Sequence, residues 1–212
     1  MKKRYMKPNL YMDFDGTLVS NKQRLYRFFI NNIPEEFRCV LSEDIFWELK
    51  RKCVHEIDWL NNQYQADLNK DSYNELKKRD IEKLEYLQYE ELLPHTIDAL
   101  HKLRTKYRII LISRRSMPEG LYAELDRFAI RKLLDEVHVI PHDKTTKGEY
   151  IKKTFDVSGN DVLVGDTEDD ITAGYALQIK TYLVLSGIRD ESVISRFGLK
   201  GIKVIPDISL ID

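Results

Sequence analysis

The feature that most constrains the fold of this chain is a series of short, strongly apolar runs, each followed by a turn or a polar segment. The runs cover residues 9–14, 107–113, 137–140, 162–165 and 181–185. From residue 107 onward, the segments between the runs contain stretches of about ten residues with apolar side chains at helical spacing. Runs this short and apolar are typical of strands buried on both faces of a sheet. The pattern therefore predicts an α/β fold, in which right-handed crossovers connect a parallel sheet covered by helices on both faces.

The segment between the first and second runs has a different composition and hydrophobic pattern. It is rich in Lys, Glu, Asn and Tyr and contains no clear strand. Two apolar stripes at helical spacing lie in it: Ile45, Leu49, Cys53, Ile57 and Leu60, then Leu76, Leu84 and Leu87. Each stripe has the width of one buried helix face. We expect a helical domain at residues 20–92, inserted into an α/β core made of residues 1–19 plus 93–212; residues 20–92 are called the helical insertion below.

Composition excludes several classes of partner. The 212 residues carry 34 Lys and Arg against 35 Asp and Glu, a net charge of -1. This balance provides no overall field to attract nucleic acid or an anionic membrane, so we expect neither as a partner. No apolar run approaches the 18 residues or so that a membrane span requires. We expect a monomer or a homodimer.

The termini and cysteines bear on location. The N-terminal MKKRYMKP is followed by no apolar stretch of the kind that a secretion signal contains. Cys39 and Cys53 form no CxxC pair and have no histidine at zinc-ligand spacing, so we expect two buried thiols in a reducing compartment. Together these features favour a cytoplasmic location.

Carboxylates and one hydroxyl lie at the ends of the predicted strands. They are Asp13 and Asp15 after the first strand, Ser113 at the end of the second, and Asp166 and Asp170 after the run at 162–165. The carboxyl ends of parallel strands share one edge, where reactive groups collect. Carboxylate oxygens suit a hard cation, and Mg²⁺ in particular when phosphate is the other ligand. Either Lys144 or Lys147 is placed to supply further positive charge.

Four short motifs in this order resemble those of the haloacid dehalogenase-like (HAD) hydrolases. They are DFDGT at 13–17, Ser113 closing the strand LIS, a lysine ahead of a helix, and GDTEDD at 165–170. The resemblance covers residues 9–19 and 93–205, and the helical insertion stands where that family has its C1 cap. It implies a Rossmann-like core with an all-helical cap, similar to phosphoglycolate phosphatases and beta-phosphoglucomutase. Ordered motifs in strand context are a much stronger signal than one DxDGT string.

The resemblance also implies a mechanism. Asp13 would attack phosphorus and form an aspartyl-phosphate, and Asp15 would protonate the leaving alcohol and then deprotonate water. A regular strand would hold these two side chains about 7 Å apart. Because both must act on one phosphoryl group, we expect the chain to curl just after Asp13, with Gly16 permitting the turn.

Further roles follow from the same resemblance. Mg²⁺ would bind Asp13, the main-chain carbonyl of Asp15, Asp166 and Asp170, the last chosen over Asp169 by the GDxxxD spacing. The Ser113 hydroxyl and the backbone N–H groups near Phe14 and Arg114 would bind the phosphoryl oxygens. A lysine would offset the growing charge, and the segment KGEYI favours Lys147 over Lys144.

These residues indicate a Mg²⁺-dependent phosphomonoester hydrolase acting on a small phosphorylated metabolite. A sugar-phosphate mutase or other phosphotransferase keeps the same aspartates, and a HAD-fold binding module without catalysis is a further alternative. Arg114 and Arg115 follow Ser113 directly, so one of them is a candidate for a second anionic group on the substrate. The pair His138 and His142 lies outside a helix and does not suggest a metal site.

Overall fold

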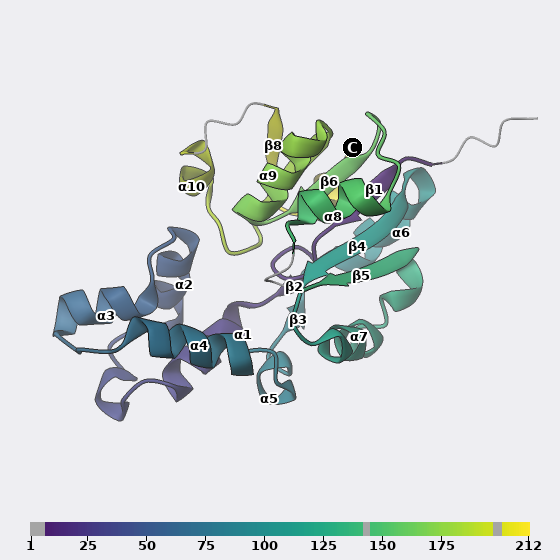
Figure 1. Ribbon diagram of the computed structural model, residues 1–212. Helices are drawn as coiled ribbons and strands as arrows, with labels where there is room; N and C mark the ends of the chain where they lie inside the picture. The colour runs from purple at the N-terminus through teal and green to yellow at the C-terminus, as the bar shows by residue number, and fades with distance from the viewer. Residues whose placement is uncertain (1–6, 142–144, 197–200) are drawn as a thin grey trace, which may run out of the picture.

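A six-stranded parallel sheet forms the centre of the molecule (Figure 1). The computed structural model describes residues 7–141, 145–196 and 201–212. The strand order is β5-β4-β1-β6-β7-β8. The bounds are β1 Asn9–Met12, β4 Arg108–Arg114, β5 Glu136–Ile140, β6 Val162–Gly165, β7 Lys180–Val184 and β8 Ile202–Ile205. The predicted α/β fold is confirmed, and β8 is a strand that the apolar runs did not reveal.

Helices cover both faces of the sheet, as alternation along β1 requires. Leu10 and Met12 face one cluster, which includes side chains of α6 (Thr96–Lys106) and α7 (Pro118–Arg127). Tyr11 faces the opposite cluster, with α8 (Lys147–Thr154) and α9 (Glu168–Leu177). The remaining short elements are η2 Arg131–Leu133, α10 Glu191–Ser195 and η3 Ile208–Leu210. Central strands are thus buried on both sides, which explains their apolar sequences.

The helical insertion has a hydrophobic cluster of its own, which includes Phe28, Phe29 and Phe46. Its elements are α1 Lys22–Asn31, η1 Glu35–Phe37, α2 Glu43–Arg51, α3 Glu56–Tyr64, α4 Lys70–Asp80 and α5 Leu84–Leu87. Where the chain enters and leaves this region, β2 (Val19–Ser20) pairs antiparallel with β3 (Glu91–Leu92). We expected no strand here, and that expectation was wrong, because two residues on each side are too few to show a period.

Two expectations for the helical insertion need correction. The stripe from Ile45 to Leu60 is not one helix: it breaks at Cys53, which has a φ of 60°. His55 then accepts a hydrogen bond from the N–H of Ile57 and caps the next helix. The stripe at 76–87 is also divided, and Leu84 is 70% exposed. Both cysteines are exposed rather than buried, because Cys53 lies in the turn between α2 and α3 and Cys39 in the loop after η1.

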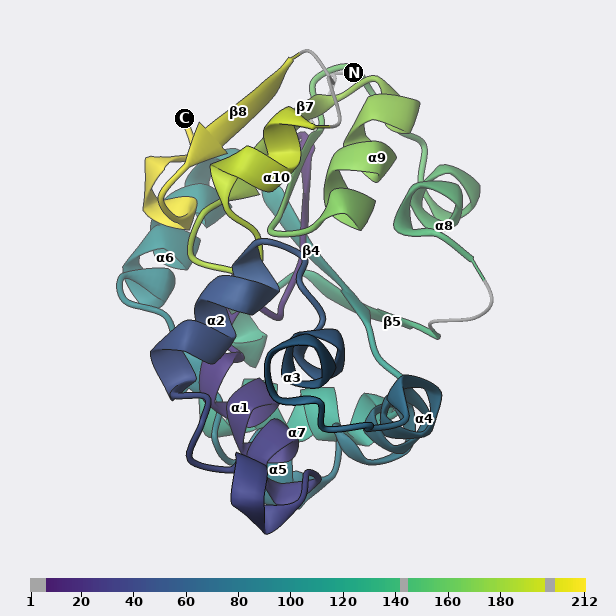
Figure 2. The ribbon, with the colours of Figure 1, turned by 90° about the vertical axis from the view of Figure 1, so that its left-hand side faces the viewer.

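The helical insertion lies over the carboxyl edge of the sheet, and α2, α3 and α4 stand in front of the strands in Figure 2. Arg51, at the end of α2, donates to the carbonyl oxygens of Leu185 (2.8 Å) and Gly187 (2.6 Å) in the loop after β7. Arg189 in turn donates to the carbonyl oxygen of Lys50 at 3.0 Å. These contacts hold the insertion against the edge at which the reactive groups of parallel sheets collect.

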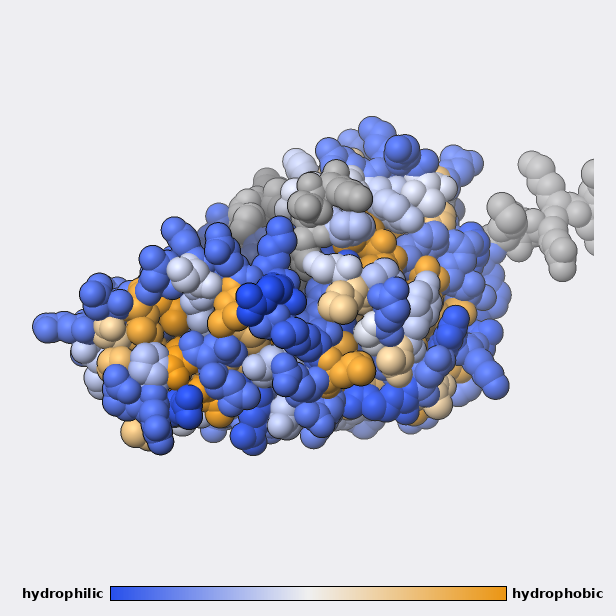
Figure 3. Space-filling view, turned by 60° about the horizontal axis from the view of Figure 1, so that its bottom comes forward, coloured by the Kyte–Doolittle hydropathy of each residue, from blue (hydrophilic) through white to orange (hydrophobic). Residues whose placement is uncertain are grey.

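The face shown in Figure 3 is mainly hydrophilic, with separate apolar patches between charged side chains. Among the described residues, no helix combines the length and the apolar composition that crossing a membrane requires.

Candidate active site

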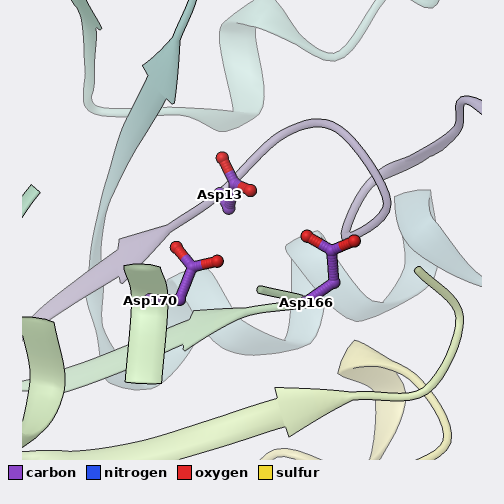
Figure 4. Close-up of side chains that lie close together, drawn as sticks. All are labelled: Asp13, Asp166 and Asp170. Atoms are coloured by element: carbon purple, nitrogen blue, oxygen red, sulfur yellow. The ribbon is translucent and has the colours of Figure 1, made fainter. Parts of the chain in front are cut away.

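Three adjacent strands bring the predicted site residues together. Asp13 follows β1, Ser113 lies near the end of β4, and Asp166 follows β6, while β4 and β6 are the two neighbours of β1. Asp170 lies in the first turn of α9. Figure 4 shows the side chains of Asp13, Asp166 and Asp170 converging, and one oxygen from each lies within 4.8 Å of the others. The sheet order therefore gathers residues that are far apart in the sequence.

A tight turn after β1 fixes the position of Asp13. The carbonyl oxygen of Phe14 accepts from the N–H groups of Thr17 (3.2 Å), Leu18 (2.9 Å) and Val19 (3.3 Å). Gly16 has a φ of 78°, and a Cβ there would lie 2.1 Å from Oδ2 of Asp166. Only glycine meets both conditions. The expected curl and the expected use of Gly16 are confirmed.

Lys147 is buried against two of these carboxylates. Its Nζ lies 2.8 Å from Oδ1 of Asp13 and 2.5 Å from Oδ1 of Asp170. A capping box of Thr146 and Glu149 begins α8 at this lysine and fixes its direction. Lys144, the alternative named above, lies outside the described residues, as does His142.

Asp170 contributes mainly by holding its neighbours. Its Oδ2 accepts from the N–H (3.0 Å) and hydroxyl (2.6 Å) of Thr167, which closes the N-terminal capping box of α9. Its Oδ1 accepts from Lys147. With both oxygens engaged, Asp170 positions the lysine and the turn that carries Asp166.

The charges at this site do not balance. Three carboxylates, of Asp13, Asp166 and Asp170, face one ammonium group. Burial raises the pKa of Asp13 to about 7; the charge of Lys147 opposes this shift, and that of Asp170 adds to it. Burial also raises the pKa of Asp166, assisted by the charges of Asp13 and Asp170. Ionising all three carboxylates therefore requires further positive charge.

Two buried polar atoms lie near the carboxyl ends of the neighbouring strands β6 and β4. Oδ1 of Asp166 and Oγ of Ser113 have no hydrogen-bond partner among the described residues. Leaving such atoms unpaired costs free energy, so a bound group is expected to satisfy them. The carboxylate oxygens fit Mg²⁺, which prefers such ligands, and the Ser113 hydroxyl fits a phosphoryl oxygen. The residues present are consistent with both.

Asp15 is not part of the three-carboxylate cluster, although it lies only two residues from Asp13. Its Oδ1 accepts from Nη2 of Arg24 and Nη2 of Arg115, both at 2.8 Å, and its Oδ2 accepts from Nε of Arg115 at 2.9 Å. Burial opposes ionisation of Asp15, but the charges of Arg115 and Arg24 outweigh it and hold its pKa well below the usual range. The acid–base role of Asp15 and the use of its carbonyl for metal stay predictions.

The contacts of Asp15 belong to a larger group, here called the Asp15 network: Asp15, Arg24, Glu90, Arg115 and Glu124. Arg115 is fully buried and also donates to Glu124 at 2.6 Å and to Glu90 at 3.2 Å. Arg24 lies 2.8 Å from Glu90 through its Nε. The guanidinium of Arg115 thus faces carboxylates of the protein, rather than the substrate group for which it was a candidate.

Sequence reasoning missed three members of this network. Arg24, Glu90 and Glu124 come from α1, from the residue before β3 and from α7, and only the tertiary fold brings them to Asp15. One local signal existed: Arg24 lies beside Leu25 on the buried face of α1. A buried arginine needs a carboxylate partner, although the sequence does not say which.

A cavity of ≈ 370 Å³ opens above Asp13 between the core and the helical insertion. From the core it is lined by Asp13, Asp15, Arg114, Arg115, Lys147, Asp166, Thr167, Glu168, Asp169 and Ile188, and from the insertion by Asn21, Arg24, Leu25, Lys77, Ile81 and Glu82. Arg114 lies 3.2 Å from Asp169 at the rim. The volume suits a small molecule.

Comparison with protein families gives a match for residues 10–184, to the family described as haloacid dehalogenase-like hydrolase. That range includes every candidate site residue named above. A search among curated proteins finds no match.

Solved structures with the same fold are numerous, and the three described here have low sequence identity. A haloacid dehalogenase-like hydrolase from Streptococcus pneumoniae has a TM-score of 0.64 at 16% identity, with 93% of each chain covered. A protein from Haemophilus somnus, predicted to be a phosphoglycolate phosphatase, has a TM-score of 0.68 at 18% identity and covers 96% of this chain and 95% of its own. A protein from Bacillus subtilis assigned to the HAD hydrolases, with magnesium bound, has a TM-score of 0.60 at 14% identity, with 96% of each covered. At these identities the likeness shows a shared fold.

Proposed function

Because this chain belongs to the haloacid dehalogenase-like hydrolases, we propose that it is a Mg²⁺-dependent phosphatase that hydrolyses a small phosphorylated metabolite through an aspartyl-phosphate. The observation that carries the proposal is the set of three buried carboxylates around one lysine. The hydroxyl of Ser113, near the end of the neighbouring strand β4, is buried and has no hydrogen-bond partner among the described residues. The set has an excess of negative charge that a divalent cation offsets, and the hydroxyl is suited to a phosphoryl oxygen.

In the first step, a carboxylate oxygen of Asp13 attacks phosphorus. The new O–P bond forms as the bond between phosphorus and the ester oxygen breaks. Arg24 and Arg115 keep Asp15 mainly ionised, so the step starts from the minor form in which Asp15 carries a proton, and Asp15 gives that proton to the departing alkoxide. Lys147 contacts Asp13 and offsets charge on the phosphoryl group. Ser113 donates its hydroxyl to a phosphoryl oxygen. The products of this step are the alcohol and a phosphorylated Asp13.

In the second step, water displaces Asp13 from phosphorus. Asp15, now ionised, accepts a proton from the water as the oxygen attacks, and the bond between phosphorus and the Asp13 oxygen breaks. Inorganic phosphate leaves and both aspartates return to their starting states. The two steps use the same residues in opposite directions, which is why one acid–base group serves both.

Asp13 and Asp166, with the main-chain carbonyl of Asp15, are the groups that would hold Mg²⁺, while Asp170 keeps Lys147 and the Asp166 turn in place. When bound, the ion neutralises charge on the carboxylates and on the phosphoryl oxygens. The unpaired Oδ1 of Asp166 and the raised pKa values of Asp13 and Asp166 support this assignment.

Phosphate release from a panel of phosphorylated metabolites tests the proposal. The panel is run with Mg²⁺, with EDTA in place of Mg²⁺, and with the Asp13→Asn protein. We expect at least one compound to be hydrolysed, and the activity to vanish in both controls. Hydrolysis that continues in the Asp13→Asn protein contradicts the covalent mechanism, and hydrolysis that survives EDTA contradicts the metal requirement. If phosphate release falls short of substrate consumed when a sugar acceptor is added, the chain is a phosphotransferase.

A further inference from the structure

Lys77 brings a positive charge from the helical insertion to the cavity above Asp13. It lies in the last turn of α4 and lines the same ≈ 370 Å³ cavity as Asp13 and Lys147, on the opposite wall. None of the mechanistic steps above uses it. Its role depends on how far carboxylates of the protein neutralise its ammonium group.

The carboxylate nearest to Lys77 is shared. Glu56 is fully buried, and its Oε2 lies 2.9 Å from Nζ of Lys50. Its Oε1 accepts from the hydroxyl of Tyr73 at 3.1 Å and lies 3.4 Å from Nζ of Lys77. One carboxylate thus stands between two ammonium groups, and Lys50 is the closer. Lys77 donates to Glu56 over the longer distance and also lines the cavity, so two positive charges share one negative charge at this wall.

Other cations that line the cavity have closer partners. Arg24 and Arg115 each lie 2.8 Å from Asp15, and Lys147 lies 2.8 Å from Asp13. Arg114 lies 3.2 Å from Asp169. Among the described cations that line the cavity, Lys77 therefore has the longest contact with a carboxylate. It is also the only one of them whose carboxylate partner lies closer to another ammonium group.

The electrostatic state of Lys77 agrees with this geometry. Burial lowers its pKa to about 8, with the charge of Lys50 adding to the effect and that of Glu56 opposing it. The side chain of Lys77 is 22% exposed, and an ammonium that shares its carboxylate with a second ammonium is stabilised by an incoming anion.

We propose that Lys77 binds a second anionic group of the substrate, while the phosphoryl group that is transferred lies against Asp13. The substrate class is then a small phosphate monoester that also carries a carboxylate or a second phosphate. Both are oxyanions that accept charge-assisted hydrogen bonds from an ammonium group. This inference rests on the phosphatase function proposed above and specifies its substrate. Lys77 is a specificity-determining residue, distant from the reacting bond.

Matched pairs of substrates test the proposal. In the first pair, 3-phosphoglycerate and glycerol 3-phosphate differ by a carboxylate; in the second, fructose 1,6-bisphosphate and fructose 6-phosphate differ by a phosphate. In the native sequence we expect kcat/KM to be about tenfold or more higher for the anionic member of at least one pair. The pair that responds identifies the anionic group.

Three variants locate the effect. Lys77→Met is expected to remove the preference, mainly by raising KM for the anionic member, with KM for its partner unchanged. Lys77→Arg keeps the charge and is expected to retain most of the preference. Lys78→Met is the matched control, because Lys78 is the next residue of α4 and is exposed. Equal preference in the Lys77→Met and native proteins overturns the inference and leaves the phosphatase function intact, as does a native protein that favours neither member of either pair.

A binding measurement separates this inference from the proposed function. The Asp13→Asn protein, which cannot turn over, is titrated with 3-phosphoglycerate and with fructose 1,6-bisphosphate in the presence of Mg²⁺. Binding that weakens about tenfold in the Asp13→Asn/Lys77→Met protein supports the Lys77 site even if no hydrolysis is found. Identical binding by the two proteins, or no binding by either, overturns it.

Discussion

Asp13 and Asp15 lie two residues apart in one turn, and both are largely buried. Their surroundings shift the pKa values of the two carboxyls in opposite directions. Asp13 faces Asp166, Asp170 and one lysine, and its pKa rises to about 7. Asp15 is held by two arginines, and its pKa falls. Burial raises the pKa of both carboxyls, although Asp15 is the more exposed, so the opposite shifts come from the charges that the fold brings to each carboxylate.

The two sides of the turn also differ in how far the protein itself neutralises their carboxylates. On the Asp13 side, three carboxylates face one lysine, so the ionised cluster has an excess of negative charge that a cation would offset. In the Asp15 network, three carboxylates face two buried arginines, and Glu124 also lies 3.6 Å from Arg127. Burial raises the pKa of Glu90; the charge of Arg24 opposes this shift, and that of Asp15 adds to it. The contact of Glu124 with Arg127 and the raised pKa of Glu90 both reduce the excess of negative charge on this side. The Asp15 side therefore needs no external ion.

The largest expected effect is that of Asp13→Asn. An amide is no nucleophile toward phosphorus, so phosphate release falls at least about a thousandfold. The fold remains, because the substitution removes one of three mutually repelling carboxylates. Phosphate release and thermal unfolding are measured on the same preparation, and a variant that is folded and still active breaks the account of Asp13.

Arg115→Gln tests the other side of the turn. Asp15, Glu90 and Glu124 lose a shared buried cation, so we expect the free energy of unfolding to fall by about 3–5 kcal/mol. Arg115→Lys keeps the charge but loses the paired contact to both oxygens of Asp15. Its kcat is expected to fall about 10–100-fold for an alkyl phosphate and much less for 4-nitrophenyl phosphate, whose leaving group needs little protonation.

Arg131→Gln is the matched control for Arg115, because Arg131 is exposed and pairs with exposed Asp126. Its effect on unfolding is expected to stay within about 0.5 kcal/mol. An equal loss of kcat for both leaving groups in Arg115→Lys means that Arg115 supports the fold without positioning Asp15.

Magnesium and pH should act together on the Asp13 side. In the metal-free protein the pKa of Asp13 is raised from 3.8 to about 7, so the bound proton stabilises the fold. This contribution is complete below pH 3.8 and is lost as the pH rises through about 7. Mg²⁺ competes with the proton, so its stabilisation, about 2.7 kcal/mol at a hundred times Kd, is expected to be fully developed at pH 8 and much smaller at pH 5.5. Thermal unfolding with and without Mg²⁺ at the two pH values measures it; equal shifts contradict the account.

The smallest effect is expected from Glu90→Gln. If Glu90 is protonated at pH 7, the amide replaces a neutral group of the same shape, and the free energy of unfolding changes by less than about 1 kcal/mol. Glu124→Gln is the comparison, because it removes a charged partner 2.6 Å from Arg115 and is expected to cost about 1.5–3 kcal/mol. Urea unfolding of both variants at pH 7 measures the difference. A cost for Glu90→Gln that equals or exceeds the cost for Glu124→Gln shows that Glu90 is a charged partner in the Asp15 network.

Local patterns in the sequence were sufficient to predict the central strands of the sheet and the residues that gather around Asp13. The apolar run at 162–165 coincides with β6, and the strand ends indicated where Asp13, Ser113 and Asp166 would meet. β8 escaped notice because it is only four residues long, lies at the sheet edge and has its apolar residues interrupted by Lys203. A local period cannot reveal a two-residue strand such as β2 either.

The Asp15 side was beyond sequence reasoning for a different reason. Its position after Ser113 made Arg115 a candidate for binding substrate. The direction of its side chain depends on Glu90 and Glu124, which tertiary packing brings to it. The same holds for Lys77, whose significance depends on how Lys50 and Tyr73 share Glu56. Buried charge networks are set by the whole fold, and no local spacing encodes them.

Magnesium titration of three proteins, followed by thermal unfolding at pH 8, tests the contrast between the two aspartates most directly. Mg²⁺ is expected to raise Tm in the native protein and in Asp15→Asn, whose side chain lies outside the three-carboxylate cluster. In Asp13→Asn the apparent affinity for Mg²⁺ is expected to fall at least about tenfold, because one of its carboxylate ligands is gone. An unchanged response in Asp13→Asn, or a response lost in Asp15→Asn while the protein stays folded, contradicts the account.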